Sequence, residues 1–501
     1  MSALQLWMAV GLFLFLILMA YLGWLGYKKT NTVSDFAIAG GQMGPVVLGL
    51  AFAATFFSAA TFVGYTGWAY GWGLSSLWIV LTLILASPMG LIVVAKRVRE
   101  SNIKQGSLSL PDWLGDRYGS NFVRVAVALA TMFNLFYIAA QFSAGALVFQ
   151  QYLGVPYLFG LTVIAIIVTA YTVGGGSYAD IYTDAAQAVL MAVTGIMVVI
   201  SGFWVFNKGF TGIMEDVTGA LSDRGPEYVA VVNPDSGIFY SIPAIIGAFI
   251  IQFAFSSQPQ LFNKVLALKN PHDMAKMIIT YVVAAIAFLS VVFGGYYAVL
   301  VAPDLEQSDA AILAYAQEAF PTVLVAVIGV TIMAAAMSTS DGIFVVISTA
   351  VANDIYRKYL VAKGWAGKGA SADEIDRRSL TISRWVTVIT GIVAAALVIN
   401  PPAFIGSFIW IGISGIASAT LGPILVALFL PKLATRRAAS LSVVVGIASY
   451  LTIHFLGVEE STMAMGAWAV LIGLATMILG GLVLKDPPTA HTPAAESVRR
   501  A

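Results

Sequence analysis

The sequence predicts an all-α integral membrane protein with thirteen transmembrane helices, built around an inverted five-helix repeat that contains two discontinuous helices. Three observations lead to this fold. The chain of 501 residues is 59% hydrophobic and only 10% charged, whereas soluble domains carry about 25% charged residues. Thirteen apolar stretches follow one another along the chain. Two of them, five stretches apart, are interrupted in a way that a plain membrane anchor is not.

The hydropathy of the chain, averaged over about 19 residues, places the thirteen stretches at 4–27, 44–72, 75–97, 121–151, 156–173, 178–207, 239–268, 273–301, 320–356, 381–399, 402–429, 435–456 and 463–484. The first stretch is too long for a signal-peptide core, so we expect it to be retained. These boundaries divide the chain into an extra N-terminal helix with its loop (1–43), a first repeat (44–237), a second repeat (238–430), two C-terminal helices (431–485) and a disordered tail (486–501).

The Lys and Arg residues predict how the helices are oriented. With the N-terminus outside, all 26 of these residues except Lys208 and Arg224 fall on the inner side. Basic residues gather in the cytoplasmic loops of membrane proteins, and the opposite loops here are acidic, as at Glu215 and Asp304. We therefore expect an outer N-terminus and a cytoplasmic C-terminus, in the cytoplasmic membrane of a bacterium or archaeon.

The two interrupted stretches differ in composition from their neighbours. The middle of 44–72 is rich in small and hydroxylated residues between Ala53 and Thr61, where a lipid-facing helix would carry Leu, Ile and Val. The stretch 239–268 contains Ser-Ser-Gln-Pro-Gln from Ser256, and Pro259 removes a backbone hydrogen bond. We expect a break in the first stretch. In the second stretch, the residues agree with either a break or a simple kink near the inner end.

Composition also excludes several classes of function. The net charge of +1 gives no support for nucleic-acid binding. The chain has no Cys and only three His residues, so it offers neither a thiolate metal site nor the metal centre or nucleophile–base pair of an intramembrane enzyme. A channel is disfavoured by the pair of interrupted helices. The lipid bilayer is the partner that the composition does require.

Four motifs occur in the order in which the sodium/solute symporter family has them. They are AATFFSAATFVG from Ala53, GGGSYADIYTDAAQ from Gly174, QPQLFNKVLALK from Gln258 and AAAMSTSDGIFVVISTAVANDIY from Ala334. The chain resembles this family over nearly its whole length. The resemblance implies the leucine-transporter fold with an extra N-terminal helix. Within the family, QFSAGALVFQQYLGVPY and NPPAFIG look most like the branch that transports pantothenate and monocarboxylates.

The resemblance implies a sodium site that joins the first broken helix to the stretch 320–356. Its ligands would be the carbonyl oxygens of Ala54, Phe57 and Ala335 and the hydroxyl oxygens of Ser338 and Thr339. Such a set suits a hard cation, because it supplies several oxygens without burying a full negative charge. The alternative is that both hydroxyls bond back to carbonyls of their own helix.

Two carboxylates, Asp184 and Asp341, lie within apolar stretches. A buried carboxylate is costly unless it is paired, protonated or bound to an ion, so we expect them to hold a second cation or to take part in coupling. For Asp184, which matches an aspartate of the family, the alternative is a cap at the start of its helix.

Polar and aromatic residues near the broken helices are candidates for binding a solute: Phe56, Thr61, Gln141 and Gln252. For the amides, hydrogen bonding between helices is the alternative. Phe56 argues against a sugar, whose hydroxyls need polar partners. We expect no Lys or Arg at mid-membrane, so an anionic solute would depend on helix N-termini and bound sodium for its countercharge.

The resemblance therefore implies a symporter that uses Na⁺ to import a small organic solute by alternating access. We expect a monocarboxylate such as pantothenate, pyruvate, acetate or propionate. The alternative is a neutral or zwitterionic solute such as proline, another amino acid or a sugar.

Overall fold

The computed structural model describes residues 2–255, 258–400 and 405–486, and within them the chain is helical with no strand beyond one isolated bridge between Met43 and Leu268. The first half contains α1 (Ala3–Lys29), α2 (Val33–Ile38), α3 (Pro45–Phe56), α4 (Ala59–Phe62), α5 (Gly64–Trp72), α6 (Leu77–Gln105), α7 (Leu110–Tyr118), α8 (Asn121–Ala130), α9 (Asn134–Val148), α10 (Tyr157–Val205) and α11 (Phe210–Arg224).

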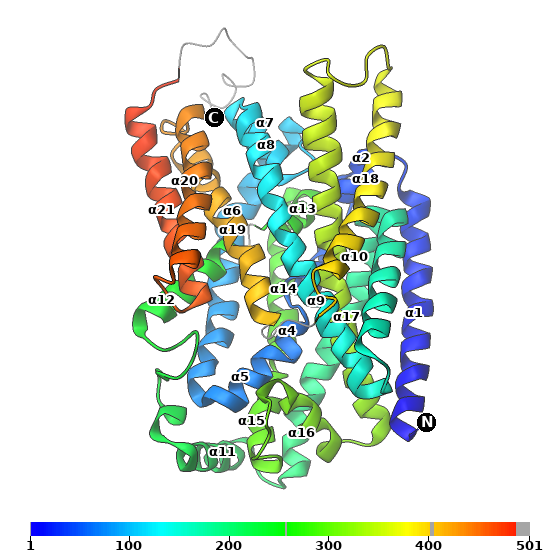
Figure 1. The fold of residues 1–501 in the computed structure, drawn as a ribbon, viewed down its shortest axis with the longest axis vertical. Helices are drawn as coiled ribbons and strands as arrows, with labels where there is room; N and C mark the ends of the chain where they lie inside the picture. Colours follow the sequence, from blue (N-terminus) through cyan, green and yellow to red (C-terminus); the bar gives the residue numbers. More distant parts are fainter. Residues whose placement is uncertain (1, 256–257, 401–404, 487–501) are drawn as a thin grey trace.

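The second half is equally helical. It contains α12 (Ile242–Phe255), α13 (Pro259–Ala267), α14 (Met274–Leu289), α15 (Val292–Val301), α16 (Ala311–Ala319), α17 (Thr322–Thr349) with its π-helical continuation η8 (Ala350–Val361), α18 (Ala372–Ala396), α19 (Ile405–Phe429), α20 (Arg436–Leu456) and α21 (Thr462–Val483). The long helices stand roughly side by side as one bundle, while α11, α15 and α16 gather at one end and α7 lies near the other (Figure 1).

Ten helices among the described residues are long and apolar enough to cross a membrane, or eleven if the bent pair α12–α13 is one span. The all-α membrane fold is thus confirmed, whereas the count of thirteen spans and the division into repeats stay predictions. Apolar side chains cover the outside of the bundle, as at Phe13 and Leu14 of α1, which are 65% and 61% exposed. Such a surface is suited to lipid.

The helix α10 turns back on itself at Gly176, whose φ of 50° and ψ of −140° are not helical. Gln5, at the start of α1, donates a hydrogen bond to Leu153 just before α10, and Thr30, just after α1, donates one to Gly175. Gln187 then contacts Met19, back along α1. The segments 157–175 and 177–205 are therefore antiparallel, and both pack on α1. This agrees with the two separate stretches expected from the sequence.

The first broken helix is confirmed. After α3, Phe57 and Ser58 adopt extended conformations, and the side chain of Ser58 caps α4 by accepting a hydrogen bond from Ala60. In a continuous helix the amide of Ala59 would bond to the carbonyl of Thr55, but it donates to Gln141 Oε1 at 3.2 Å. The break therefore frees carbonyl groups in the middle of the bundle.

The second interrupted helix consists of α12 and α13, which meet at an angle of 41°. Pro259 begins α13, where a missing amide proton costs nothing. Ser256 and Ser257 of the expected break lie outside the described residues. The same holds for the tail after residue 486.

Candidate functional site

The end of α3 meets the middle of α17 through two hydroxyl groups. Ser338 Oγ donates to the carbonyl of Ala54 at 2.9 Å, and Thr339 Oγ1 lies 3.1 Å from the carbonyl of Thr55. Both hydroxyls also contact the carbonyl of Ala335 in their own helix, at 3.1 and 3.4 Å. The contacts to α3 and the back-bonds expected as the alternative are thus both present, and all these residues are buried.

This group of oxygens fits a small hard cation by its chemistry. It consists of carbonyl and hydroxyl oxygens in a dry part of the bundle, which is the donor set that sodium takes from a broken transmembrane helix. Phe57, the fifth expected ligand, stands in the extended break itself. Thr55 adds a carbonyl that the sequence analysis did not include.

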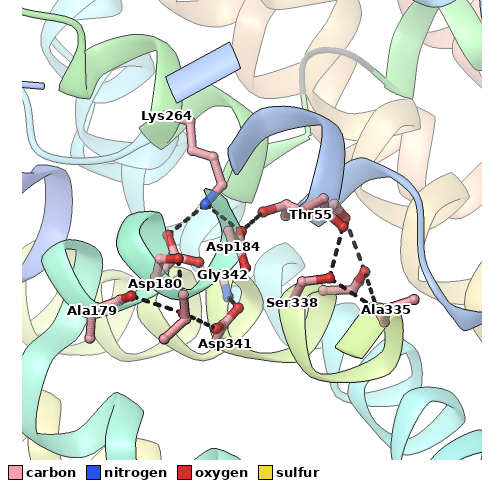
Figure 2. A network of polar contacts seen from close by, with 12 residues as sticks. Thr55, Ala179, Asp180, Asp184, Lys264, Ala335, Ser338, Asp341 and Gly342 are labelled. Carbon is pink, nitrogen blue, oxygen red and sulfur yellow. Dashed lines mark hydrogen bonds and ion pairs between the residues drawn. The ribbon is translucent and has the colours of Figure 1, made fainter. Parts of the chain in front are cut away.

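Three carboxylates form a second polar group beside the first (Figure 2). One oxygen from each of Asp180, Asp184 and Asp341 lies within 4.8 Å of the others. Asp341 accepts hydrogen bonds from Tyr171 at 2.9 Å, from Thr183 at 3.2 Å and from its neighbouring backbone amide. The sequence analysis had singled out Asp184 and Asp341. Asp180 was missed, although its position four residues before Asp184 places both on one helix face.

Lys264 of α13 reaches into this carboxylate group. Its Nζ lies 2.7 Å from Asp180 Oδ2 and 2.9 Å from Asp184 Oδ2, and its side chain is 1% exposed. The assignment of Lys264 to an inner loop is therefore wrong, because Lys264 is buried in the second interrupted helix. A buried lysine is stable there only because carboxylates from α10 surround it.

Asp184 is not a helix cap. It lies two turns beyond Gly176, is fully buried, and accepts hydrogen bonds from Lys264 and from Thr55 Oγ1 at 2.5 Å. Thr55 thus contacts both polar groups, through its carbonyl on the Thr339 side and through its hydroxyl on the Asp184 side. Figure 2 shows Thr55 between Lys264 and Asp184 on one side and Ser338 on the other.

The solute-binding candidates lie around the break in α3. Phe56 packs on Phe255 at the end of α12, with ring centroids 4.5 Å apart. Gln141 accepts a hydrogen bond from the amide of Ala59 at the start of α4, and Thr61 is buried two residues further on. Gln252 is buried on α12, one turn before Phe255. The two ends of the interrupted helices are therefore in contact through aromatic rings.

Two of these amides keep unused hydrogen-bonding capacity. Within the described residues, both polar atoms of Gln252 and the Nε2 of Gln141 are buried without a hydrogen-bond partner. Leaving a buried polar atom unpaired is costly. These amides are therefore suited to a polar solute at the break, and they are uncharged.

A helical membrane bundle that pairs a broken helix with hydroxyl and carboxylate groups of distant helices defines a class, that of secondary transporters with discontinuous helices. The chain belongs to the sodium:solute symporter family, whose model matches residues 36–446. It is a membrane transporter and not an enzyme, and sodium-coupled symport is the activity of the family.

Relatives of known function extend over most of the chain. It is 24% identical over 490 residues to the osmoregulated proline transporter OpuE of Bacillus subtilis, covering 95% of this chain and 94% of that protein. It is 26% identical over 451 residues to the high-affinity proline transporter PutP of the same species, covering 86% and 89%. A solved structure of a Na⁺-coupled sialic acid symporter in an outward-open state matches with a TM-score of 0.78 and 18% identity, covering 96% and 98%. That likeness shows the fold.

Proposed function

We propose that the protein imports a small zwitterionic solute, with proline as the first candidate, across the plasma membrane together with sodium. The sodium coupling is supported by one observation: the hydroxyls of Ser338 and Thr339 contact the carbonyls that the break of α3 releases. The choice of proline over a monocarboxylate rests on the two proline transporters among the relatives and on the uncharged amides of Gln141 and Gln252.

The proposed solute site lies beside Phe56, Thr61, Gln141 and Gln252. The first amides of α4 already donate to Gln141 and Ser58, so the positive end of this half-helix favours a carboxylate group through its dipole. The aromatic pair Phe56–Phe255 favours a compact apolar ring such as pyrrolidine. The unpaired amide oxygen of Gln252 can accept a hydrogen bond from an ammonium group. Together these groups match a zwitterion better than a bare anion.

Sodium would act here as a substrate that orders the pocket. Its proposed ligands are the carbonyls of Ala54, Phe57 and Ala335 with the hydroxyls of Ser338 and Thr339. Their binding to one ion would hold α3 against α17 and so fix the position of Phe56 and of the α4 N-terminus. Each positive charge that enters down a membrane potential of 100 mV, negative inside, contributes about 2.3 kcal/mol, which can drive accumulation of the solute.

Uptake into proteoliposomes tests this function. Labelled proline should accumulate only with an inward sodium gradient, and unlabelled proline should compete while acetate, propionate, pyruvate and pantothenate in excess should not. Competition by these carboxylates and none by proline would reverse the choice of solute. Uptake that does not depend on sodium would overturn the coupling.

A further inference from the structure

Lys264 places its ammonium group beside a cluster of three buried aspartate side chains. The side chains of Lys264, Asp180 and Asp184 are 1%, 4% and 0% exposed, so water does not screen them. The lysine comes from the second interrupted helix, α13, and both aspartates come from the segment 177–205 of α10. The ion pair therefore joins two helices through residues that are 80 and 84 positions apart in the sequence.

The local packing is adapted to this arrangement. A Cβ atom on Gly342 of α17 would lie 3.2 Å from Asp180 Oδ1 and 3.1 Å from Thr55 Cγ2. A side chain at this position would press against the carboxylate. Glycine thus leaves room for Asp180 beside Asp184 and Asp341.

The ammonium group already occupies the position that a mobile cation would take between Asp180 and Asp184. It lies within 2.9 Å of an oxygen from each of them, and Asp184 Oδ2 also accepts the Thr55 hydroxyl. A second monovalent ion on the same oxygens would stand next to the ammonium, and like charges this close repel strongly in a dry site.

We propose that Lys264 is a tethered cation that fills this carboxylate group, so that the protein couples each solute to one sodium ion, bound at the Ser338–Thr339 site, and not to two. This inference rests on the proposed sodium symport. It assigns Lys264 a part in setting the number of coupling ions. Asp184, connected through Thr55 to the sodium site, then supplies negative charge near that ion while its own oxygens are held by Lys264.

Removal of the ammonium should create a second sodium site. Asp180 Oδ1 and Asp184 Oδ1 are buried without a hydrogen-bond partner within the described residues. Without Lys264, Asp180 Oδ2 would also be free and Asp184 Oδ2 would keep only the Thr55 hydroxyl. A hard cation takes such carboxylate oxygens readily. Lys264→Met keeps much of the length and apolar stem of the side chain but not its charge, and Lys264→Arg keeps the charge.

Two measurements test this proposal. Binding of ²²Na⁺ to purified protein counts sodium ions without any transport, and the ratio of sodium to solute flux in proteoliposomes counts them during transport. We expect one bound ion and a flux ratio of one to one for the wild type and for Lys264→Arg. For Lys264→Met we expect two bound ions.

The wild type alone keeps the proposal falsifiable if Lys264→Met does not fold. Two sodium ions per solute in the wild type would overturn the tethered cation while leaving sodium symport intact. One bound ion in both the wild type and Lys264→Met would also overturn it. Removal of the ammonium group would then have opened no second sodium site, so Lys264 would not be occupying one. Uptake with no sodium dependence would instead refute the proposed function itself.

Discussion

Thr55 is the residue through which the two polar groups of the site communicate. Its carbonyl faces Thr339 and its hydroxyl bonds to Asp184. A movement at the end of α3 therefore changes both contacts at once. The break after Phe56 makes this possible, since a continuous helix would use the Thr55 carbonyl for its own hydrogen bond.

Ser338→Ala should weaken sodium binding. The change removes one expected ligand oxygen and the hydrogen bond to Ala54. We expect the half-saturating sodium concentration for uptake to rise about tenfold or more, which corresponds to about 1.4 kcal/mol. The matched control is Ser340→Ala on the same helix, because Ser340 is equally buried but bonds only to Ala336 among the described residues. Equal sodium dependence in the two variants would contradict the assignment.

Gln252→Leu should affect the solute more than the ion. The amide of Gln252 has unpaired polar atoms near the break, and Leu fills similar space without them. We expect the KM for the solute to rise about fivefold to tenfold, as for one lost hydrogen bond of roughly 1 kcal/mol, with sodium affinity unchanged. Ser442→Ala serves as the control, because Ser442 of α20 donates its hydrogen bond to Gly473 of α21. An unchanged KM would place Gln252 outside the solute site.

At the scale of the elements, the interrupted helices and the reversal in α10 bring the polar groups together. The break in α3 depends on Ser58 as a cap, and the bend before α13 depends on Pro259. The reversal at Gly176 turns the segment that carries Asp180 and Asp184 back into the bundle. Each of these three features ends a helical segment inside an apolar stretch that would otherwise continue as one helix.

Gly176→Ala should destabilise the reversal in α10. At φ 50° and ψ −140°, a residue with a Cβ is strained by about 1–3 kcal/mol, and this Cβ would stand 2.6 Å from the ring of Phe36. We expect a clear loss of folded protein in detergent, measured by thermal unfolding and size-exclusion chromatography. Gly174→Ala is the control, since its Cβ would meet only the ring of Tyr27 at an ordinary 3.4 Å. Equal stability of both variants would contradict the argument.

Glu459, in the loop between α20 and α21, ties that loop to the start of α12. Burial raises the pKa of its carboxyl group, but hydrogen bonds from Tyr240, Trp468 and the amides of Ser461 and Glu460 outweigh burial and hold this pKa below its ordinary value. A depressed pKa means that the carboxylate stabilises the folded state above its ordinary pKa of about 4.3, and that this contribution is lost as the pH falls through the folded-state pKa.

Glu459→Gln should therefore lower the Tm at pH 7. The free energy of unfolding should fall by about 1 kcal/mol, because a half-buried charged acceptor of hydrogen bonds is removed. The difference from the wild type should narrow progressively below about pH 4. Glu460→Gln is the control, because the side chain of Glu460 is exposed. Thermal unfolding followed by intrinsic fluorescence checks this. A difference that does not depend on pH would show that the charge is not involved.

At the scale of the whole molecule, the bundle has two chemically different ends. The helix α1 starts at one end and α21 finishes at the other (Figure 1), which is the arrangement that thirteen crossings would give. The loop that contains Lys363 and Lys368 lies between η8 and α18, while α11 carries Glu215 and Asp216 at the opposite end. We propose that the end with the basic loop faces the cytoplasm.

The absence of Cys from the sequence allows a direct test of this orientation. In intact cells, an impermeant maleimide should label Asp223→Cys in α11 and should not label Lys368→Cys, because both positions are exposed but belong to opposite ends. Permeabilised cells should label both equally. Labelling of Lys368→Cys alone in intact cells would invert the proposed topology.

Much of the fold could be predicted because apolar length and local chemistry determine it. The stretches around α1, α6 and α21 are apolar enough to be placed by hydropathy, and the small residues before Phe57 indicated the break. The hydroxyls Ser338 and Thr339 were found because they recur in a family motif. Asp180 and Lys264 were not found, since neither a lone aspartate nor a lysine near a helix end shows by itself what it contacts.

The sequence by itself determined that this chain forms a bundle of membrane helices and that the first core helix breaks near Phe57. The resemblance of its motifs to a family indicated which hydroxyls stand opposite the break. Only the tertiary structure decided that Lys264 is paired with Asp180 and Asp184 and that Thr55 joins this group to Ser338 and Thr339. The physical reason is that apolar length and helix breaks are local properties of the chain. The energy of a buried charge, in contrast, depends on partners that only folding brings near.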